Sequence, residues 1–151
     1  MAGPVAELRV REGGWTSTSS EPGVPAGGLP VSARLGQQVS TAHLRLMGTS
    51  TVLTVALSTA PGASVRPEDA RVRACRITTA DWRPERPGPA VPFDADDCVD
   101  GVLSARTVTF DLADYGDRSG PAGFAVVADL RGSTAPRTFR LILTPDPEDT
   151  P

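Results

Sequence analysis

The chain has 151 residues, of which 39% are hydrophobic and 22% charged, and its formal net charge is −3. This length and apolar content suit a single domain with one hydrophobic core. All 15 basic residues are arginine, and the absence of lysine and asparagine excludes Schiff-base lysines, P-loop lysines and N-glycosylation sites. The acidic balance provides no basic footprint, so we expect no nucleic-acid partner.

Membrane insertion is not expected either, because no apolar run approaches the ~20 residues that a membrane-spanning helix needs. The chain begins with Met-Ala-Gly-Pro-Val-Ala-Glu. This stretch lacks the basic and apolar segments of a secretory signal.

Short strands are the expected elements, since 15 glycines and 15 prolines interrupt the chain too often for long helices. Polar and apolar residues that alternate with a period of two indicate half-buried strands. The predicted strands are residues 5–11, 39–47, 51–58, 70–78, 102–112, 123–130 and 138–144. Residues 47–50 are predicted to form a hairpin turn between strands 39–47 and 51–58. The apolar run of 51–58 is typical of a central strand that is covered on both faces.

Two stretches are predicted to be irregular. Residues 15–30 are rich in serine, threonine, glycine and proline, which favours a long loop with room for one short edge strand. Residues 81–101 are rich in proline and aspartate and are interpreted as an irregular excursion. The whole pattern predicts an all-β domain over residues 1–144, an antiparallel β-sandwich of jelly-roll type with about seven to nine strands. A flexible, acidic, proline-rich tail over residues 145–151 is expected to follow.

The two cysteines are candidates for a disulfide. Cys75 shares the outward face of its predicted strand with Arg71 and Arg73, and Cys98 closes the excursion. A bond between them would tie the excursion to the sheet and stabilise the domain by roughly 3 kcal/mol. It would also indicate an oxidising compartment, whereas two buried free thiols would indicate a reducing one.

His43 is the single histidine, and the alternation places it on the polar side of its strand beside Thr41 and Arg45. We therefore expect a histidine at the surface or rim. Nothing local supplies the nucleophile and carboxylate of a catalytic triad, and the chain has no nucleophile-elbow or nucleotide-binding motif. The sequence thus predicts no catalytic residues and a protein that is not an enzyme.

The densest acidic cluster contains Asp94, Asp96, Asp97 and Asp100. Carboxylate oxygens are the ligands that calcium prefers, and it takes about six to eight of them. Calcium is therefore the one cofactor that the sequence suggests. The spacing does not fit an EF-hand, and the alternative is an acidic loop that is simply solvated. A hydrolase that uses a pair of these carboxylates is a third functional hypothesis.

Three aromatic residues lie in loops or at strand ends, where their rings could stack on the apolar face of a sugar. They are Trp15, Trp82 and Tyr115. The alternative for Trp82 is that it plugs one end of the sandwich. The alternative for Tyr115 is a place in a turn with Asp114, Gly116 and Asp117.

The order of several motifs, which spans residues 39–143, resembles a known class of domain. Cys75 is followed by Trp82 in a proline-rich stretch, by Phe93-Asp94 and Cys98, and then by TFDL at 109–112, GFAVV at 123–127 and TFRL at 138–141. This order is similar to non-catalytic β-sandwich domains of secreted and cell-wall-attached proteins of GC-rich Gram-positive bacteria. It is more remotely similar to DNRLRE-type surface domains and jelly-roll carbohydrate-binding modules.

The resemblance implies an extracellular or surface-display binding module that contacts polysaccharide or cell-wall glycan. The alternative is a structural or decoration component of a phage or other particle. Such a component should expose a sizeable apolar patch or exchange an arm with a neighbouring copy.

Overall fold

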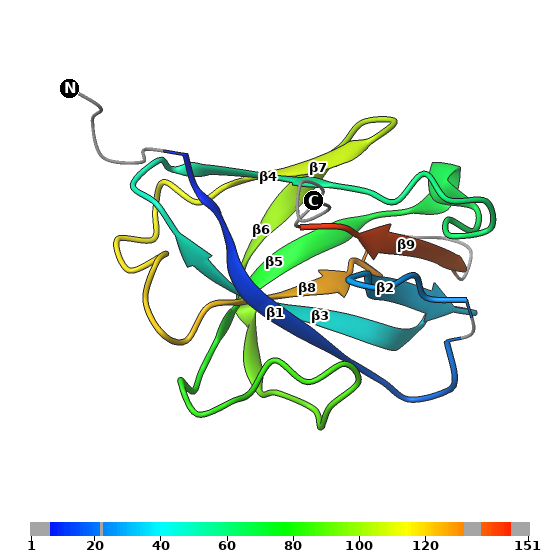
Figure 1. Cartoon of the computed structure of the whole chain (residues 1–151), viewed down its shortest axis with the longest axis horizontal. Coiled ribbons are helices and arrows are strands. Elements are labelled where there is room, and N and C mark those ends of the chain that lie inside the picture. The colour runs from blue at the N-terminus through cyan, green and yellow to red at the C-terminus, as the bar shows by residue number, and fades with distance from the viewer. Residues whose placement is uncertain (1–6, 22, 132–136, 146–151) are drawn as a thin grey trace.

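The computed structural model describes residues 7–21, 23–131 and 137–145, which form nine β-strands and one short 3-10 helix, η1 (Pro67–Asp69) (Figure 1). The strands are β1 (Arg9–Ser17), β2 (Leu29–Arg34), β3 (Gln37–Met47), β4 (Val52–Ala56), β5 (Val72–Ile77), β6 (Phe93–Leu103), β7 (Thr107–Asp111), β8 (Phe124–Ala128) and β9 (Phe139–Leu143). The all-β class and the expected strand number are confirmed. Residues 5 and 6 of the first predicted strand and residues 146–151 of the predicted tail lie outside the described residues.

The strands form one antiparallel sheet that is nearly closed into a barrel, which is compatible with a sandwich-like fold. Their order is β4-β7-β6-β5-β8-β3-β2-β9, and β1 pairs with β3. The two ends of this path meet where Leu57, just after β4, bridges Leu143 of β9. Ser58 N donates to Ile142 O at 2.8 Å, and Thr144 N donates to Ala56 O at 2.8 Å. This contact gives partners to backbone groups that an open sheet would leave at its edges.

β1 and β2 share one edge of β3, one after the other. β2 pairs with the first residues of β3 up to Ser40, and β1 pairs with β3 from Ser40 to Met47. β8 occupies the opposite edge of β3. The segment that joins β1 to β2 must therefore leave and return near Ser40, and this geometry places the β1–β2 loop against the outer face of the sheet there.

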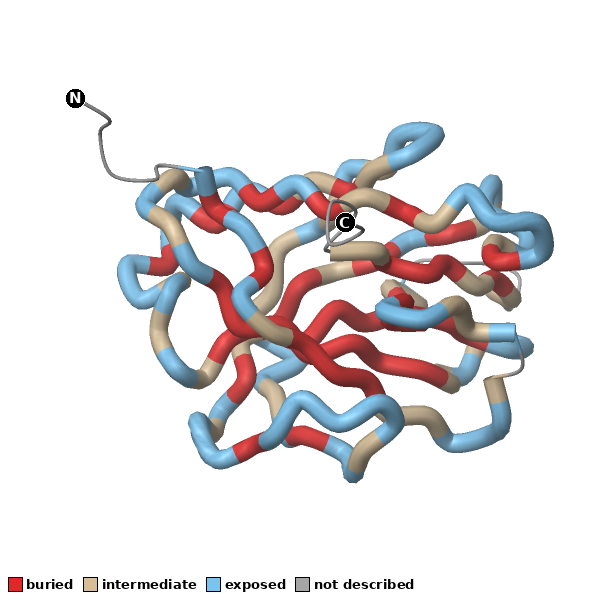
Figure 2. The backbone as a smooth tube through the Cα atoms, in the orientation of Figure 1, coloured by how far each residue is buried: buried red, intermediate tan, exposed pale blue. Residues whose placement is uncertain are grey.

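The main hydrophobic core lies inside the closed sheet and receives side chains from every strand, because successive residues of a strand point to opposite faces. Figure 2 shows where buried residues lie along the chain. Each large aliphatic or aromatic side chain buried in this way contributes roughly 1.5–3 kcal/mol. Among the largest fully buried side chains are Leu44, Phe110, Leu112, Phe139 and Leu141.

A second, smaller apolar cluster lies on the outer face of β5 and β8. Residues 78–92, which we call the strap, fold over that face and bury Trp82 and Val91 against it. The strap also bonds to the backbone of β1: Trp15 N donates to Glu85 O at 3.0 Å, and Gly88 N donates to Trp15 O at 2.8 Å. The first part of the excursion predicted from the sequence is therefore a layer that covers the outer face of the sheet.

Four predicted strands coincide well with β3, β5, β8 and β9, and 51–58 contains β4. The first predicted strand, 5–11, is wrong in its bounds, since β1 continues to Ser17 through residues that looked like a loop. The predicted loop 15–30 also hides the start of β2, where Pro30 argued against a strand. β2 pairs with β3 only from Ser32 onward. Pro30, which has no N–H group, therefore interrupts no hydrogen bond between β2 and β3.

Four further predictions are corrected. β6 begins at Phe93, so the second part of the predicted excursion is a strand, and 102–112 is not one strand but the end of β6, a turn and β7. Residues 47–50 do not form a hairpin, because β4 pairs with β7 and not with β3. β4 is not covered on both faces, since Val52 is 42% exposed. β4 and β7 are distant in the sequence, so local pattern does not encode their pairing.

Candidate functional site

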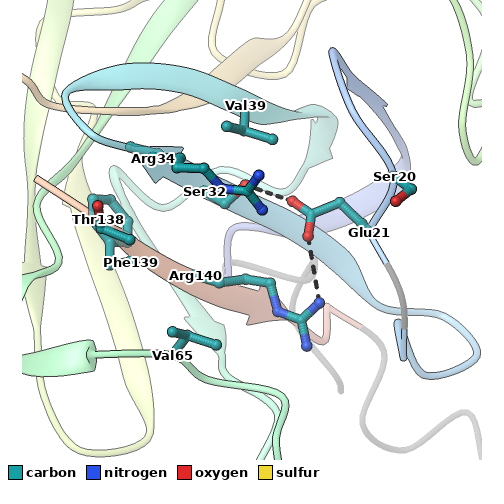
Figure 3. A pocket seen from close by; sticks show the side chains of 10 residues that line it. Ser20, Glu21, Ser32, Arg34, Val39, Val65, Thr138, Phe139 and Arg140 are labelled. Atoms are coloured by element: carbon teal, nitrogen blue, oxygen red, sulfur yellow. Dashed lines mark hydrogen bonds and ion pairs between the residues drawn. The ribbon is translucent and has the colours of Figure 1, made fainter.

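The candidate site is an open groove of about 280 Å³ on the outer face of β2 and β9, where the β1–β2 loop passes over them (Figure 3). We call it the Glu21 groove. Its polar lining residues are Ser20, Glu21, Ser32, Arg34, Thr138 and Arg140.

Glu21 is the central polar group of the groove, and its side chain is only 7% exposed. Ser32 Oγ donates a hydrogen bond to Glu21 Oε2 at 2.5 Å, and Ser40 Oγ donates to the same oxygen. The two serines are register partners in β2 and β3, so their hydroxyls stand side by side on the outer face. Arg140 Nη1 lies 3.4 Å from Glu21 Oε1. The buried carboxylate therefore has hydrogen-bonding partners on both oxygens, as a buried charge requires.

Arg140 closes the other side of the groove. Because Phe139 and Leu141 of β9 point into the core, Arg140 between them points outward. Arg140 Nε donates to Ala63 O at 3.0 Å, and Arg140 Nη2 donates to Gly62 O at 2.9 Å. These bonds join the loop before η1 to the groove.

Arg34, at the end of β2, is the exposed cation of the groove. Its side chain makes no hydrogen bond or ion pair with the described residues. Beside it, Leu35 N donates to Thr138 Oγ1 at 2.9 Å. Val39 and Val65 supply the apolar part of the lining. The groove thus offers a cation, hydroxyls and an apolar surface, which is an arrangement for binding a polar organic ligand.

The predicted disulfide is confirmed. Cys75 of β5 and Cys98 of β6 are register partners, with 2.06 Å between their sulfur atoms. The alternative of two free thiols is therefore wrong.

His43 is not at the surface or rim, which corrects the prediction. It is 2% exposed, because the strap covers the outer face of β3 and sets the ring of Trp82 5.8 Å from the imidazole, centroid to centroid. Burial lowers the pKa of His43 to about 4. Nε2 of His43 has no hydrogen-bond partner among the described residues.

The neighbour of His43 on this face, Arg45, is also buried. Arg45 Cζ lies 3.8 Å from the ring centroid of Trp82, and Arg45 Nη1 pairs with Glu12 Oε2 at 2.6 Å. Arg45 Nη2 donates to the carbonyl oxygens of Ala80 at 2.9 Å and Trp82 at 2.6 Å. Arg45 thus fastens the strap to β3.

The three aromatic residues predicted to stack on sugar do not form an exposed platform. Trp15 is 8% exposed, and Trp82 and Tyr115 are each 7% exposed, so their ring faces are covered. Trp82 Nε1 donates to Ala122 O at 2.7 Å. Tyr115 OH donates to Asp97 Oδ1 at 2.8 Å. Burial, together with that bond, raises the pKa of Tyr115 to about 12. Trp15 and Tyr115 pack in the main core, and Trp82 packs in the smaller cluster between the strap and the sheet.

The four aspartates considered for calcium lie along strand β6 and not on a loop, and they do not converge. Asp94 Oδ1 accepts a bond from Asp96 N at 2.9 Å, Asp97 accepts the bond from Tyr115, and Asp100 pairs with Arg131 at 2.9 Å. Within the part of the chain that the structure describes, no group of three or more His, Cys, Asp or Glu side chains is placed to hold a metal ion. The geometry gives calcium no support.

Sequence reasoning missed the Glu21 groove, although one signal was present. Glu21 is the single charged residue between Trp15 and Pro30, in a stretch otherwise made of small, polar and apolar residues. An isolated charge in such a stretch indicates an anchor, but its partners on β2, β3 and β9 are visible only after folding.

No family model, curated protein or solved structure matches the chain. Among the described residues, no helix is long and apolar enough to span a membrane.

Proposed function

We propose that the protein is a non-enzymatic extracellular binding module, of the surface-display kind, that contacts polysaccharide or cell-wall glycan through the Glu21 groove. The observation that carries this proposal is the lining of the groove. Hydroxyls and a charged pair stand beside an apolar surface formed by Val39 and Val65. A sugar ring presents the same combination, with hydroxyl groups at its rim and C–H groups on its faces.

The size of the groove limits what it can hold. Its volume of about 280 Å³ lies at the lower end of ligand pockets, which range over roughly 300–1,000 Å³. A groove of this size accommodates a small unit, such as one sugar residue of a longer chain. The groove is open to solvent on the wall of the barrel, so the remainder of a polysaccharide can continue past it.

The disulfide supports the extracellular part of the proposal. Disulfides form and persist in oxidising surroundings, whereas cytosolic thiols are generally kept reduced. The bond between Cys75 and Cys98 joins two adjacent strands beneath the strap. An oxidising compartment is where such a bond would stabilise the folded domain.

The geometry favours binding over hydrolysis. A glycosidase ordinarily places two carboxyl groups on either side of the scissile bond. Glu21 is the carboxylate that lines the groove, and its two oxygens already accept bonds from Ser32 and Ser40 and face Arg140. His43 is sealed beneath Trp82 on a different part of the outer face.

The particle-component alternative draws less support from the surface. Exposed large hydrophobic residues belong to separate elements rather than to one strand face. Among the described residues they are Leu35, Met47, Val52, Val65 and Val102.

A groove-filling variant tests the proposal. Wild-type protein is passed over a panel of insoluble neutral and acidic polysaccharides, and we expect retention by at least one of them. Val65→Trp fills the groove from its rim and should weaken retention at least about tenfold, which corresponds to ~1.4 kcal/mol. Val102→Trp makes the same change at an exposed site outside the groove and should leave retention unchanged.

Two results would count against the proposal. Retention of Val65→Trp equal to that of wild type would remove the groove as the binding site. Absence of wild-type retention on every polysaccharide of the panel would contradict glycan binding altogether. Near-ultraviolet circular dichroism of each variant verifies that the fold is intact.

A further inference from the structure

The Glu21 groove carries a positive charge on a protein that is negative overall. Its charged lining residues are Glu21, Arg34 and Arg140, so two cations face one anion. The whole chain has a formal net charge of −3. The charge of the whole protein would therefore not attract an anionic ligand, and any affinity for an anion would have to come from a cation in the groove itself.

The charged side chains of the groove differ in whether they already have partners in the protein. Glu21 and Arg140 are committed to each other, and both also bond to groups of the protein: Glu21 to Ser32 and Ser40, and Arg140 to the carbonyls of Gly62 and Ala63. Arg34 makes no such contact with the described residues and is exposed. Its guanidinium is the cation of the groove that is available to a ligand.

The backbone that carries Arg34 is held firmly although its side chain is exposed. Arg34 and Gln37 are register partners across the turn formed by Leu35 and Gly36, which have φ angles of 50° and 78°. Leu35 N donates to Thr138 Oγ1 at 2.9 Å, and Gly36 N donates to Arg137 O at 2.9 Å. These two bonds fasten the turn to the segment that enters β9. The side chain of Arg34 therefore starts from a fixed point at the rim of the groove (Figure 3).

We propose that the groove binds a carboxylate-bearing sugar, the uronic acid unit of an acidic polysaccharide, and that Arg34 binds its carboxylate. This inference rests on the proposed function and narrows its ligand class. A planar guanidinium matches a carboxylate with two parallel hydrogen bonds, which an ammonium group cannot do. The hydroxyls of Ser20 and Thr138 line the same groove and face the hydroxyl groups of the sugar, while Val39 and Val65 contact its C–H surface.

The test uses two polysaccharides with the same sugar backbone, one with free carboxylates and one with neutral methyl esters. Polygalacturonic acid carries a carboxylate on each sugar, and its fully methyl-esterified form carries none. We expect the wild-type protein to bind the acid at least tenfold more tightly than the ester in affinity electrophoresis. We also expect this preference to weaken as the NaCl concentration rises.

Substitutions of Arg34 then assign the preference to one residue. Arg34→Gln should bind acid and ester equally, and Arg34→Lys, which keeps the charge and loses the planar fork, should retain part of the preference. Arg11→Gln is the matched control. It removes the same charge from an exposed site on β1, near the residues that pair with Arg45 and Leu46 at the opposite end of β3. It should behave as wild type.

Each contrary result has a distinct meaning. Equal binding of acid and ester by the wild-type protein, or retention by neutral polysaccharides alone, would overturn the carboxylate proposal and leave glycan binding standing. A tenfold preference for the acid that survives in Arg34→Gln would overturn the role of Arg34. Absence of retention on any polysaccharide would contradict both this inference and the proposed function.

Discussion

The indole of Trp82 lies over the imidazole of His43, with 5.8 Å between the ring centroids and 54° between the ring planes. The two residues belong to different layers, Trp82 to the strap and His43 to the outer face of β3. Trp82 also stacks with Arg45 at 3.8 Å. One aromatic side chain therefore converts the polar face of a strand into a buried interface and leaves a neutral histidine within it.

The first prediction concerns pH. Burial lowers the folded-state pKa of His43 from 6.5 to about 4. At about pH 8 and above the histidine is neutral in both states and contributes no pH dependence. Between pH 6.5 and 4 this histidine becomes protonated in the unfolded chain but stays largely neutral in the folded protein. The free energy of unfolding therefore falls as pH falls. The loss over this window should approach about 3 kcal/mol, as measured by urea unfolding.

A variant isolates this effect from that of the carboxylates, which also titrate in acid. His43→Phe removes the titrating group, and its stability should fall less than that of wild type over the same window. The charged groups beside His43 on the packed face, Arg45 and its partner Glu12, remain in both proteins. NMR titration should give a pKa for His43 near 4 in wild type and closer to 6.5 in Trp82→Ala. A wild-type pKa above 6 would show that the strap does not cover this histidine.

The second prediction concerns the disulfide. Replacing both Cys75 and Cys98 by alanine should lower the free energy of unfolding by roughly 3 kcal/mol, because the bond restricts the unfolded chain. The two cysteines are 23 residues apart in sequence and enclose the whole strap. Hydrogen exchange should therefore increase most in the strap. Peptide mapping without reductant should show one cross-linked pair, and alkylation of both thiols in the untreated protein would contradict the bond.

The third prediction concerns the contact between β1 and the strap. A Cβ atom on Gly14 would lie 2.5 Å from Glu85 O, so Gly14→Ala must push the strap away from β1. We expect a loss of about 1–3 kcal/mol in thermal or denaturant unfolding. Gly116→Ala is the control, since its added methyl group meets nothing within 4 Å. Equal stability of the two variants would mean that β1 and the strap are not in contact.

The fourth prediction concerns the anchor of the β1–β2 loop. Glu21→Gln removes the charge that Ser32, Ser40 and Arg140 surround, and it should cost about 1–3 kcal/mol of folding free energy. Protease cleavage within residues 18–28 should become faster, because the loop loses its attachment to β2 and β9. Glu68→Gln makes the same change at an exposed position in η1 and should be neutral. An unchanged cleavage rate in Glu21→Gln would show that the loop is held by other contacts.

The sequence predicted those parts of the fold in which local pattern and burial agree. β3, β5 and β9 alternate because one face of each packs into the main core, whereas β8 is apolar throughout because the main core covers one of its faces and the smaller cluster covers the other. The same alternation placed Cys75 on the outer face, where the strap was expected to cover it. β1, β2 and β6 were missed wholly or in part, because glycine, proline and aspartate weaken the strand pattern and pairing with distant segments compensates for it.

The candidate site was beyond the reach of the sequence for a related reason. Hydrophobic alternation assigns a side chain to the inner or outer face of a strand, and this alone determined the all-β class and the face on which His43, Arg45 and Cys75 lie. Whether an outer face meets solvent depends on which distant segment folds over it. Tertiary structure therefore decided that the strap buries His43 and that Glu21 meets Arg140 across 119 residues, because these contacts join segments that are distant in the chain and meet only when a loop or the strap folds over the paired strands.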